Sequence, residues 1–155
     1  MLVLFVCHGN TCRSPAAAAV TVTRLAERGL DHIEVRSAGL SPRSQGDPPN
    51  ELAVAEGKRR GYSITGSARQ LTTADLDAAE LAIAMDHDNL ARLDELAGGP
   101  RHQLRLFLDF DPHSEPGSPI PDPWGHGPEA YAAMFDSVER AAAGLVDHLG
   151  ALDPN

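Results

Sequence analysis

The chain has 155 residues, 42% of them hydrophobic and 23% charged, proportions typical of one soluble globular domain with a sizeable core. Its formal net charge of −9 argues against nucleic acid or an anionic membrane as a partner, since either needs a basic surface. No apolar run is long enough to span a membrane, and the chain enters a predicted strand at once without a signal peptide, so we expect a cytoplasmic protein. The only cysteines, Cys7 and Cys12, share one loop and are too close to staple a fold.

Predicted strands and helices alternate along the chain. Strands are predicted at residues 2–6, 33–37, 81–85 and 104–110, and helices at 15–28, 51–60, 86–97 and 128–149. A further helix is predicted to start with Thr72 or Thr73 as its N-cap. The alternation favours right-handed crossovers. We therefore predict an α/β fold: a single three-layer domain over residues 1–155, with a central four-stranded parallel sheet and helices on both faces.

The loop after the first strand has the composition of an oxyanion site. Residues 7–15 have the sequence CHGNTCRSP, and we predict Ser14 as the N-cap and Pro15 as the first residue of the helix that follows. Loop amides and the free N–H groups of the helix point into one concavity, where Arg13 can grip two phosphate oxygens. The helix dipole makes this concavity positive, and a positive field favours the thiolate form of Cys7. Ser14 can also donate a hydrogen bond to the sulfur. The sequence thus predicts a nucleophile at the base of a phosphate-sized cup.

This segment resembles the phosphate loop of the low-molecular-weight protein tyrosine phosphatases, and further matches span nearly the whole chain. The resemblance implies a cysteinyl-phosphate mechanism, with Cys7 as nucleophile and Arg13 as phosphate clamp. It also implies that the other loop residues bind the substrate or its phosphate, namely His8, Gly9, Asn10, Thr11, Cys12 and Ser14. Residues 37–39, Ser-Ala-Gly, resemble a family motif in which Ser37 would hold Asn10 by a hydrogen bond.

The resemblance also sets the expected partners. We expect a phosphorylated protein as substrate, and phosphate or other oxyanions as product or inhibitor. We expect a monomer or weak dimer without a cofactor. The histidines outside the loop have no metal-ligand spacing, so no metal is implied.

A late loop, residues 111–127, offers the acid that such chemistry needs. Asp122 is flanked by Pro121 and Pro123 and followed by Trp124, and this run resembles the general-acid loop of the family. Asp-Pro alone is a common turn, but together with the cysteine loop it predicts Asp122 as general acid and then base. Asp109 and Asp111 are alternative candidates for the acid, but they lie at or just after the end of a predicted strand and lack this rigid setting. Trp124 is expected to wall the cleft and contact the leaving group.

Two loop side chains, His8 and Thr11, are expected at the mouth of the site. Family members that act on phosphoarginine in proteins carry threonine at the position of Thr11, and residues 122–125, Asp-Pro-Trp-Gly, resemble their Asp-Pro-Phe-Gly. Because threonine also occurs at this position in members called tyrosine phosphatases, we predict a phosphotyrosine phosphatase first. A protein-arginine phosphatase that uses the same residues, with Thr11 as selector, is the alternative.

Cys12 and Gly66 are two further points of comparison with the family. Cys12 resembles a second cysteine that forms a reversible disulfide with the oxidised nucleophile, the alternative being a small buried residue. Gly66 stands where the family often has a histidine that helps to hold the loop asparagine, so Ser37 is expected to do more of that work.

Other function classes fit the sequence less well. A thioredoxin-coupled arsenate reductase on this scaffold uses further downstream cysteines, and this chain has none beyond Cys12. A non-catalytic phosphate-binding module would be expected to have lost Cys7, Arg13 or Asp122. A dinucleotide-binding enzyme is disfavoured because no G-x-G-x-x-G follows the first strand.

Overall fold

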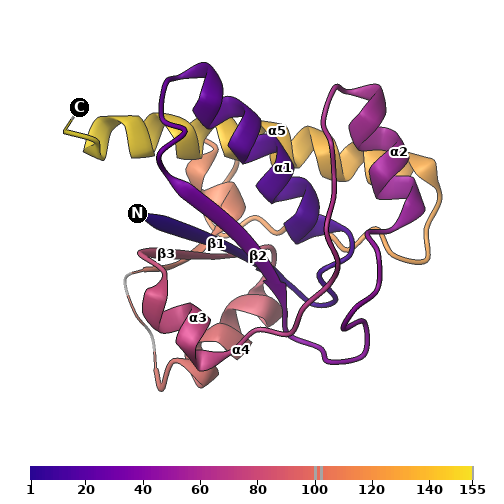
Figure 1. The fold of residues 1–155 in the computed structure, drawn as a ribbon, viewed down its shortest axis with the longest axis horizontal. Helices are drawn as coiled ribbons and strands as arrows, with labels where there is room; N and C mark the ends of the chain where they lie inside the picture. Colours follow the sequence, from indigo (N-terminus) through magenta and orange to yellow (C-terminus); the bar gives the residue numbers. More distant parts are fainter. Residues whose placement is uncertain (100, 102, 155) are drawn as a thin grey trace.

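The computed structural model describes residues 1–99, 101 and 103–154. Its centre is a sheet of four parallel strands in the order β2-β1-β3-β4 (Figure 1). The strands are β1 (Leu2–Cys7), β2 (Glu34–Gly39), β3 (Leu81–Ala84) and β4 (Leu104–Leu106). Strand β1 is central, with Val3 opposite Val35 on one side and Leu81 on the other. The predicted parallel sheet is confirmed.

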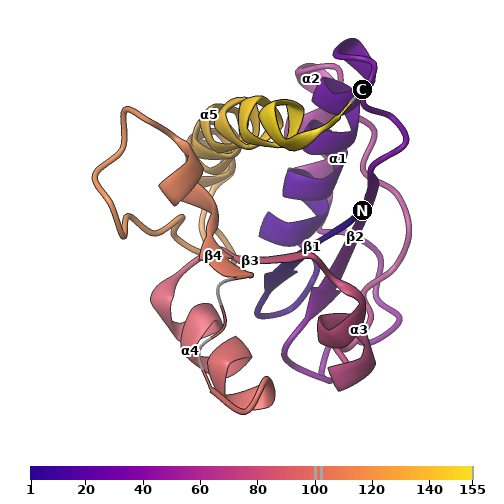
Figure 2. The same ribbon diagram turned by 90° about the vertical axis from the view of Figure 1, so that its left-hand side faces the viewer.

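Helices cover both faces of the sheet, as the three-layer prediction requires (Figure 2). One face carries α1 (Arg13–Glu27), α2 (Glu51–Arg59) and α5 (Pro128–Leu152). The other face carries α3 (Thr73–Ala78) and α4 (His87–Leu96). Thr72 is the N-cap of α3 and forms a capping box with Asp75, one of the two caps that the sequence predicted there.

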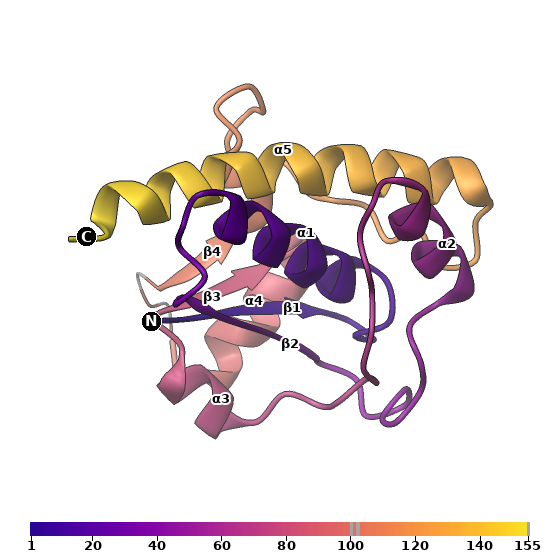
Figure 3. The same ribbon diagram turned by 45° about the horizontal axis from the view of Figure 1, so that its top comes forward.

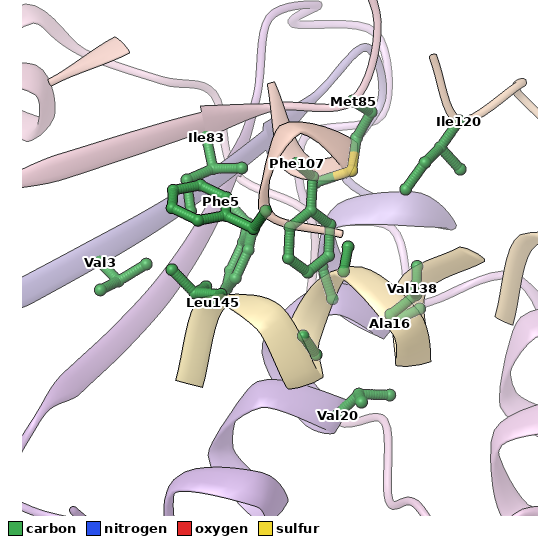
Figure 4. Packing of buried hydrophobic residues seen from close by; sticks show 14 of the residues in the cluster. Val3, Phe5, Ala16, Val20, Ile83, Met85, Phe107, Ile120, Val138 and Leu145 are labelled. Atoms are coloured by element: carbon green, nitrogen blue, oxygen red, sulfur yellow. The ribbon is translucent and has the colours of Figure 1, made fainter. Parts of the chain in front are cut away.

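The core has two parts because both faces of β1 are buried. Val3 and Phe5 point toward α1 and α5, whereas Leu2, Leu4 and Val6 point toward α3 and α4, the alternation of a strand. Figure 4 shows the larger part, in which the rings of Phe5 and Phe107 lie 4.9 Å apart between their centres. These side chains fix the end of β1 from which the cysteine loop leaves.

The predicted strand over residues 104–110 is wrong in its second half. Strand β4 ends at Leu106, and a 3-10 helix, η1 (Phe107–Phe110), follows. Phe107, Leu108 and Phe110 all belong to the same part of the core. A strand would send neighbouring side chains to opposite faces, whereas a tight helical turn gathers them on the side of α5.

Two details of α1 also differ from the prediction. The helix begins at Arg13, with Cys12 as N-cap, so Ser14 is not the cap. The helical spacing of Ala19, Val22 and Leu25 predicts that these three residues face the core, but Val22 is 51% exposed, while Ala17 and Val20 are fully buried. The alanines give little contrast in hydropathy between the faces of the helix, and packing against α5 determines which residues are buried.

Three connections meet where the strands end (Figure 3). They are the loop between β1 and α1, the segment between β2 and α2, and the segment that leads from η1 into α5. Parallel strands end at one edge of a sheet, which is where such folds place ligands. Within the described residues, no helix combines the length and the hydropathy that crossing a membrane requires.

Candidate active site

A cavity of about 370 Å³ opens at this edge. Residues from all three connections line it: Cys7, His8, Gly9, Thr11, Cys12, Arg13, Ser41, Arg43, Ser44, Asp122 and Trp124. Eight of the predicted site residues are therefore brought together around one space. The other three, Asn10, Ser14 and Ser37, do not line this cavity and are joined by hydrogen bonds to one another.

The sulfur of Cys7 is buried and surrounded by hydrogen-bond donors. The backbone N–H of Asn10 donates to Cys7 Sγ over 3.2 Å, and Ser14 Oγ lies 3.0 Å from the same sulfur. Because Asn10 Nδ2 donates to Ser14 Oγ over 2.8 Å, the hydroxyl hydrogen of Ser14 is left to point at the sulfur. Ser14 thus serves the loop instead of capping α1, and its hydroxyl donates a hydrogen bond to Cys7 Sγ.

Asn10 holds the shape of the loop. Its φ of 57° is left-handed, a conformation that asparagine tolerates better than most residues. Its side chain donates to Ser37 Oγ over 3.0 Å, the bond that the sequence predicted, and accepts from the backbone N–H of Arg69 over 3.0 Å. Although Gly66 replaces the family histidine, the amide of Asn10 is therefore held from two sides. A Cβ at Gly39 would lie 2.9 Å from Asn10 Cβ, so glycine is needed there for this close approach.

The guanidinium of Arg13 is aimed by groups from two other elements. Its side chain is 2% exposed, and Nη1 donates to Asp86 Oδ2 over 2.6 Å and to the carbonyl of Ile120 over 2.9 Å. Its Nε has no hydrogen-bond partner among residues 1–99, 101 and 103–154. One edge of the guanidinium is thus fixed, and the other is available to an anion in the cavity.

Sequence analysis missed Asp86, which joins Arg13 to α4. Asp86 is the N-cap of α4, and its Oδ1 accepts from the backbone N–H of Asn89 over 2.8 Å. The available signal was an acidic N-cap directly after a buried strand, because that position lies at the same edge of a parallel sheet as the cysteine loop.

Asp122 enters the cavity from the segment that precedes α5. Its Oδ1 accepts from the backbone N–H of Trp124 over 3.1 Å, and its Oδ2 lies 3.6 Å from Arg13 Nη2. The segment is tied to the sheet, since Ile120 donates to the carbonyl of Met85 over 2.8 Å. The rival carboxylates do not line the cavity: Asp109 accepts from Gly117, and Asp111 is buried against Ser114 and Arg140.

The segment after β2 forms a wall that sequence analysis did not predict. Ser41, Arg43 and Ser44 line the cavity from this side. Ser41 donates to the carbonyl of His8 and Asn50 donates to the carbonyl of Thr11, both over 2.9 Å. The wall is therefore attached to the cysteine loop at both ends. The Pro, Gly and Ser content of residues 41–50 indicated a loop but not its contacts.

Cys12 is buried, and its Sγ lies 3.6 Å from the hydroxyl of Tyr131 in the first turn of α5. Burial raises the pKa of the Cys12 thiol and, likewise, the pKa of Tyr131. Cys7 and Cys12 are both free thiols. Their pairing after oxidation stays a prediction.

No group of three His, Cys, Asp or Glu side chains in the described part of the chain could hold a metal ion. The chemistry that the cavity offers lies in a thiol, a guanidinium, a carboxyl group and backbone amides.

Comparison with known proteins gives one consistent family. The sequence profile described as low molecular weight phosphotyrosine protein phosphatase matches residues 2–153. The chain is 40% identical over 139 residues to the low molecular weight protein-tyrosine-phosphatase YfkJ of Bacillus subtilis, covering 88% of this chain and 85% of YfkJ.

Solved structures with the same fold include two phosphatases. A protein tyrosine phosphatase from Entamoeba histolytica superposes with a TM-score of 0.91 at 29% identity, covering 97% of each chain. The YwlE arginine phosphatase, in a mutant whose active-site serine is phosphorylated, superposes with a TM-score of 0.85 at 27% identity, covering 97% of this chain and 96% of that chain.

Proposed function

Because the chain belongs to the low molecular weight phosphotyrosine protein phosphatase family, whose members are cysteine-dependent hydrolases, we propose that it hydrolyses phosphotyrosine in proteins through a cysteinyl-phosphate intermediate. The supporting observation is the setting of Cys7. Its buried sulfur receives hydrogen bonds from within the loop and borders the same cavity as Arg13 and Asp122.

In the first step, Cys7 Sγ attacks phosphorus in line with the departing oxygen. The loop amides and the free edge of Arg13 hold the three non-bridging oxygens and neutralise their charge. The P–O bond to tyrosine breaks as the S–P bond forms. Neutral Asp122 gives its proton to the phenolic oxygen, which leaves as tyrosine.

In the second step, the carboxylate of Asp122 takes a proton from water, and the water oxygen attacks phosphorus. The S–P bond breaks, and the thiolate of Cys7 leaves with the bonds from Ser14 and Asn10 in place. The phosphorylated active-site serine in the YwlE mutant supports a phosphorylated nucleophile in a protein of this fold.

The nucleophile is tested by Cys7→Ser. We expect turnover of a phosphotyrosine peptide to fall by more than about a thousandfold, because a serine hydroxyl lacks the reactivity of the thiolate. Inorganic phosphate should still bind, measured by calorimetry, which shows that the cup is intact. Turnover that persists in this variant would rule out the assignment of Cys7.

The general acid is tested by Asp122→Asn with a series of aryl phosphates. The variant should slow esters of weakly acidic phenols far more than esters of acidic phenols, because only the former need a proton to leave. Asp109→Asn is the matched control, since Asp109 does not line the cavity. Equal slowing across the series would remove Asp122 as the acid.

A protein-arginine phosphatase is the second candidate, favoured by Thr11. This residue lines the cavity, and a similar structure is that of an arginine phosphatase. A threonine hydroxyl is small and polar and could bond to a phosphoguanidinium. Phosphate release from matched phosphotyrosine and phosphoarginine peptides separates the two candidates. If phosphoarginine is preferred, Thr11→Ile should reverse the preference.

A further inference from the structure

A second hollow adjoins the cavity described above. The two share Thr11, Ser44 and Trp124. The remaining lining of this hollow, which we call the side groove, comes from residues 47–52: Asp47, Pro48, Pro49, Asn50, Glu51 and Leu52. A substrate that reaches Cys7 with its phosphate therefore has a continuous path for a neighbouring residue.

The side groove combines exposed apolar surface with negative charge. Trp124 is 69% exposed and Leu52 is 37% exposed, and both are among the few large apolar side chains that remain in contact with solvent. An exposed apolar surface beside a cavity is typical of a contact site. Asp47 and Glu51 are exposed beside it, and neither carboxylate has an ion pair or hydrogen bond with another described residue.

The groove is also held in shape before any ligand arrives. Asn50 donates its backbone N–H to the carbonyl of Thr11, and its side chain accepts from the backbone N–H of Leu52 over 2.9 Å. At the other end, Asp47 donates to the carbonyl of Ser44 over 2.8 Å and accepts from the backbone N–H of Ala68 over 2.8 Å. A site whose backbone is already fixed loses little entropy on binding.

We propose that the side groove binds a lysine or arginine side chain of the substrate protein close to the phosphorylated residue, an inference that rests on the proposed function. The methylene stem of such a side chain would lie on Trp124 and Leu52, and its cationic head would reach Asp47 and Glu51. A cation over the indole face adds a further attraction. A purely apolar side chain would leave both carboxylates unused, and an acidic one would be repelled by them.

The test is a set of phosphotyrosine peptides that differ at one residue within two positions of the phosphotyrosine. That residue is Arg, Gln, Leu or Glu. At the preferred position, we expect kcat/KM for the Arg peptide to exceed that for the Gln peptide by about fivefold, and the Glu peptide to be the poorest. In the double variant Asp47→Asn/Glu51→Gln, the Arg-to-Gln ratio should fall below about twofold.

A matched double variant removes the same charge elsewhere. Asp31→Asn/Asp94→Asn changes two carboxylates that do not line the groove, and it should leave the Arg-to-Gln ratio unchanged. A ratio near one at every position, a Leu peptide as good as the Arg peptide, or an equal loss of preference in the control variant would each overturn the proposal.

Binding measurements keep this test separate from the proposed function. Affinities of the same peptides for the Cys7→Ser variant, measured by fluorescence anisotropy, should show the same Arg-to-Gln preference without turnover. Turnover of the Gln peptide by the unmodified protein with no Arg preference would reject only the groove. Absence of turnover for every peptide, with the Arg preference present in binding, would reject only the proposed hydrolysis.

Discussion

At the scale of single residues, Asp86 deserves a direct test because it accepts from Arg13 and caps α4 with separate oxygens. Asparagine caps helices as well as aspartate does, but it has a single side-chain oxygen, so while that oxygen caps α4 its amino group faces Arg13 and cannot accept a hydrogen bond. We therefore expect Asp86→Asn to lower kcat/KM about tenfold, with Tm changed by no more than about 3 °C. Steady-state kinetics measures the change in kcat/KM, and thermal unfolding measures the change in Tm. Asp88→Asn, an exposed carboxylate in the first turn of the same helix, should change neither.

Asp111 gives a prediction about stability and pH. The hydrogen bond from Ser114, followed by those from His113 N and Arg140, holds the pKa of this buried carboxyl below its usual value. A lowered pKa in the folded state stabilises the fold above the unfolded pKa of about 3.9, and this contribution is lost as the pH falls through the folded value.

The Asp111→Asn variant should therefore be less stable than the unmodified protein by about 2 kcal/mol at pH 6. The difference should shrink as the pH is lowered below about 4. Urea unfolding at several pH values measures it, with Asp31→Asn as an exposed control. A difference that stays constant down to pH 3 would contradict the prediction.

Single residues also show how much of the candidate site could be predicted from the sequence. Cys7, Arg13 and Asp122, to which we assign the proposed chemistry, lie in two short segments, so local pattern and resemblance could single them out, and the structure places them around one cavity. Asp86 and Arg43 could not, because their places depend on which strands are neighbours. Asp86 lies 73 residues from the arginine that it contacts, and only the parallel order of β1 and β3 brings them to one edge.

At the scale of elements, the contact between α5 and η1 explains why residues 107–110 are not a strand. The alternating pattern of LRLFLDF predicts a strand, and nothing local contradicts it. The decision comes from α5, where Gly144 lies directly against the carbonyl of Phe110. A glycine on the buried side of the helix lets the turn approach, and this is tertiary information that a strand pattern does not hold.

Two glycines of α5 make this contact testable. Alanine favours a helix over glycine by about 1 kcal/mol at either position. At Gly144, however, a Cβ would overlap the carbonyl oxygen of Phe110, whereas at Gly150 its nearest neighbour is Arg28 Nη2, the mobile end of a side chain, at 3.0 Å. We expect Gly144→Ala to destabilise the protein by about 3 kcal/mol or more and Gly150→Ala to be neutral or slightly stabilising. Similar Tm values for the two variants would show that η1 can move away from α5 without loss of stability.

At the scale of the whole molecule, the net charge of −9 repels the anionic substrates of the proposed activity. In the proposed phosphate site, Arg13 and the loop amides oppose this negative charge locally. Their field does not extend far, because charges separated by more than a Debye length are screened, and that length is about 8 Å at physiological salt. Segments of the substrate that pass within this distance of the rest of the protein meet the acidic surface instead of Arg13, so the charge of the substrate's remoter segments should affect encounter.

This argument predicts opposite salt dependences for two phosphotyrosine peptides that carry several lysines or several glutamates far from the phosphotyrosine, beyond the reach of the side groove. As the salt concentration rises from about 10 to about 150 mM, kcat/KM should fall for the lysine peptide and rise for the glutamate peptide, because the Debye length shortens from about 30 to about 8 Å. The kcat values should stay equal, since remote charge acts on encounter and not on the bound phosphate. Parallel salt dependences would mean that the acidic surface has no influence on association, and that selectivity arises only within the cavity and the groove beside it.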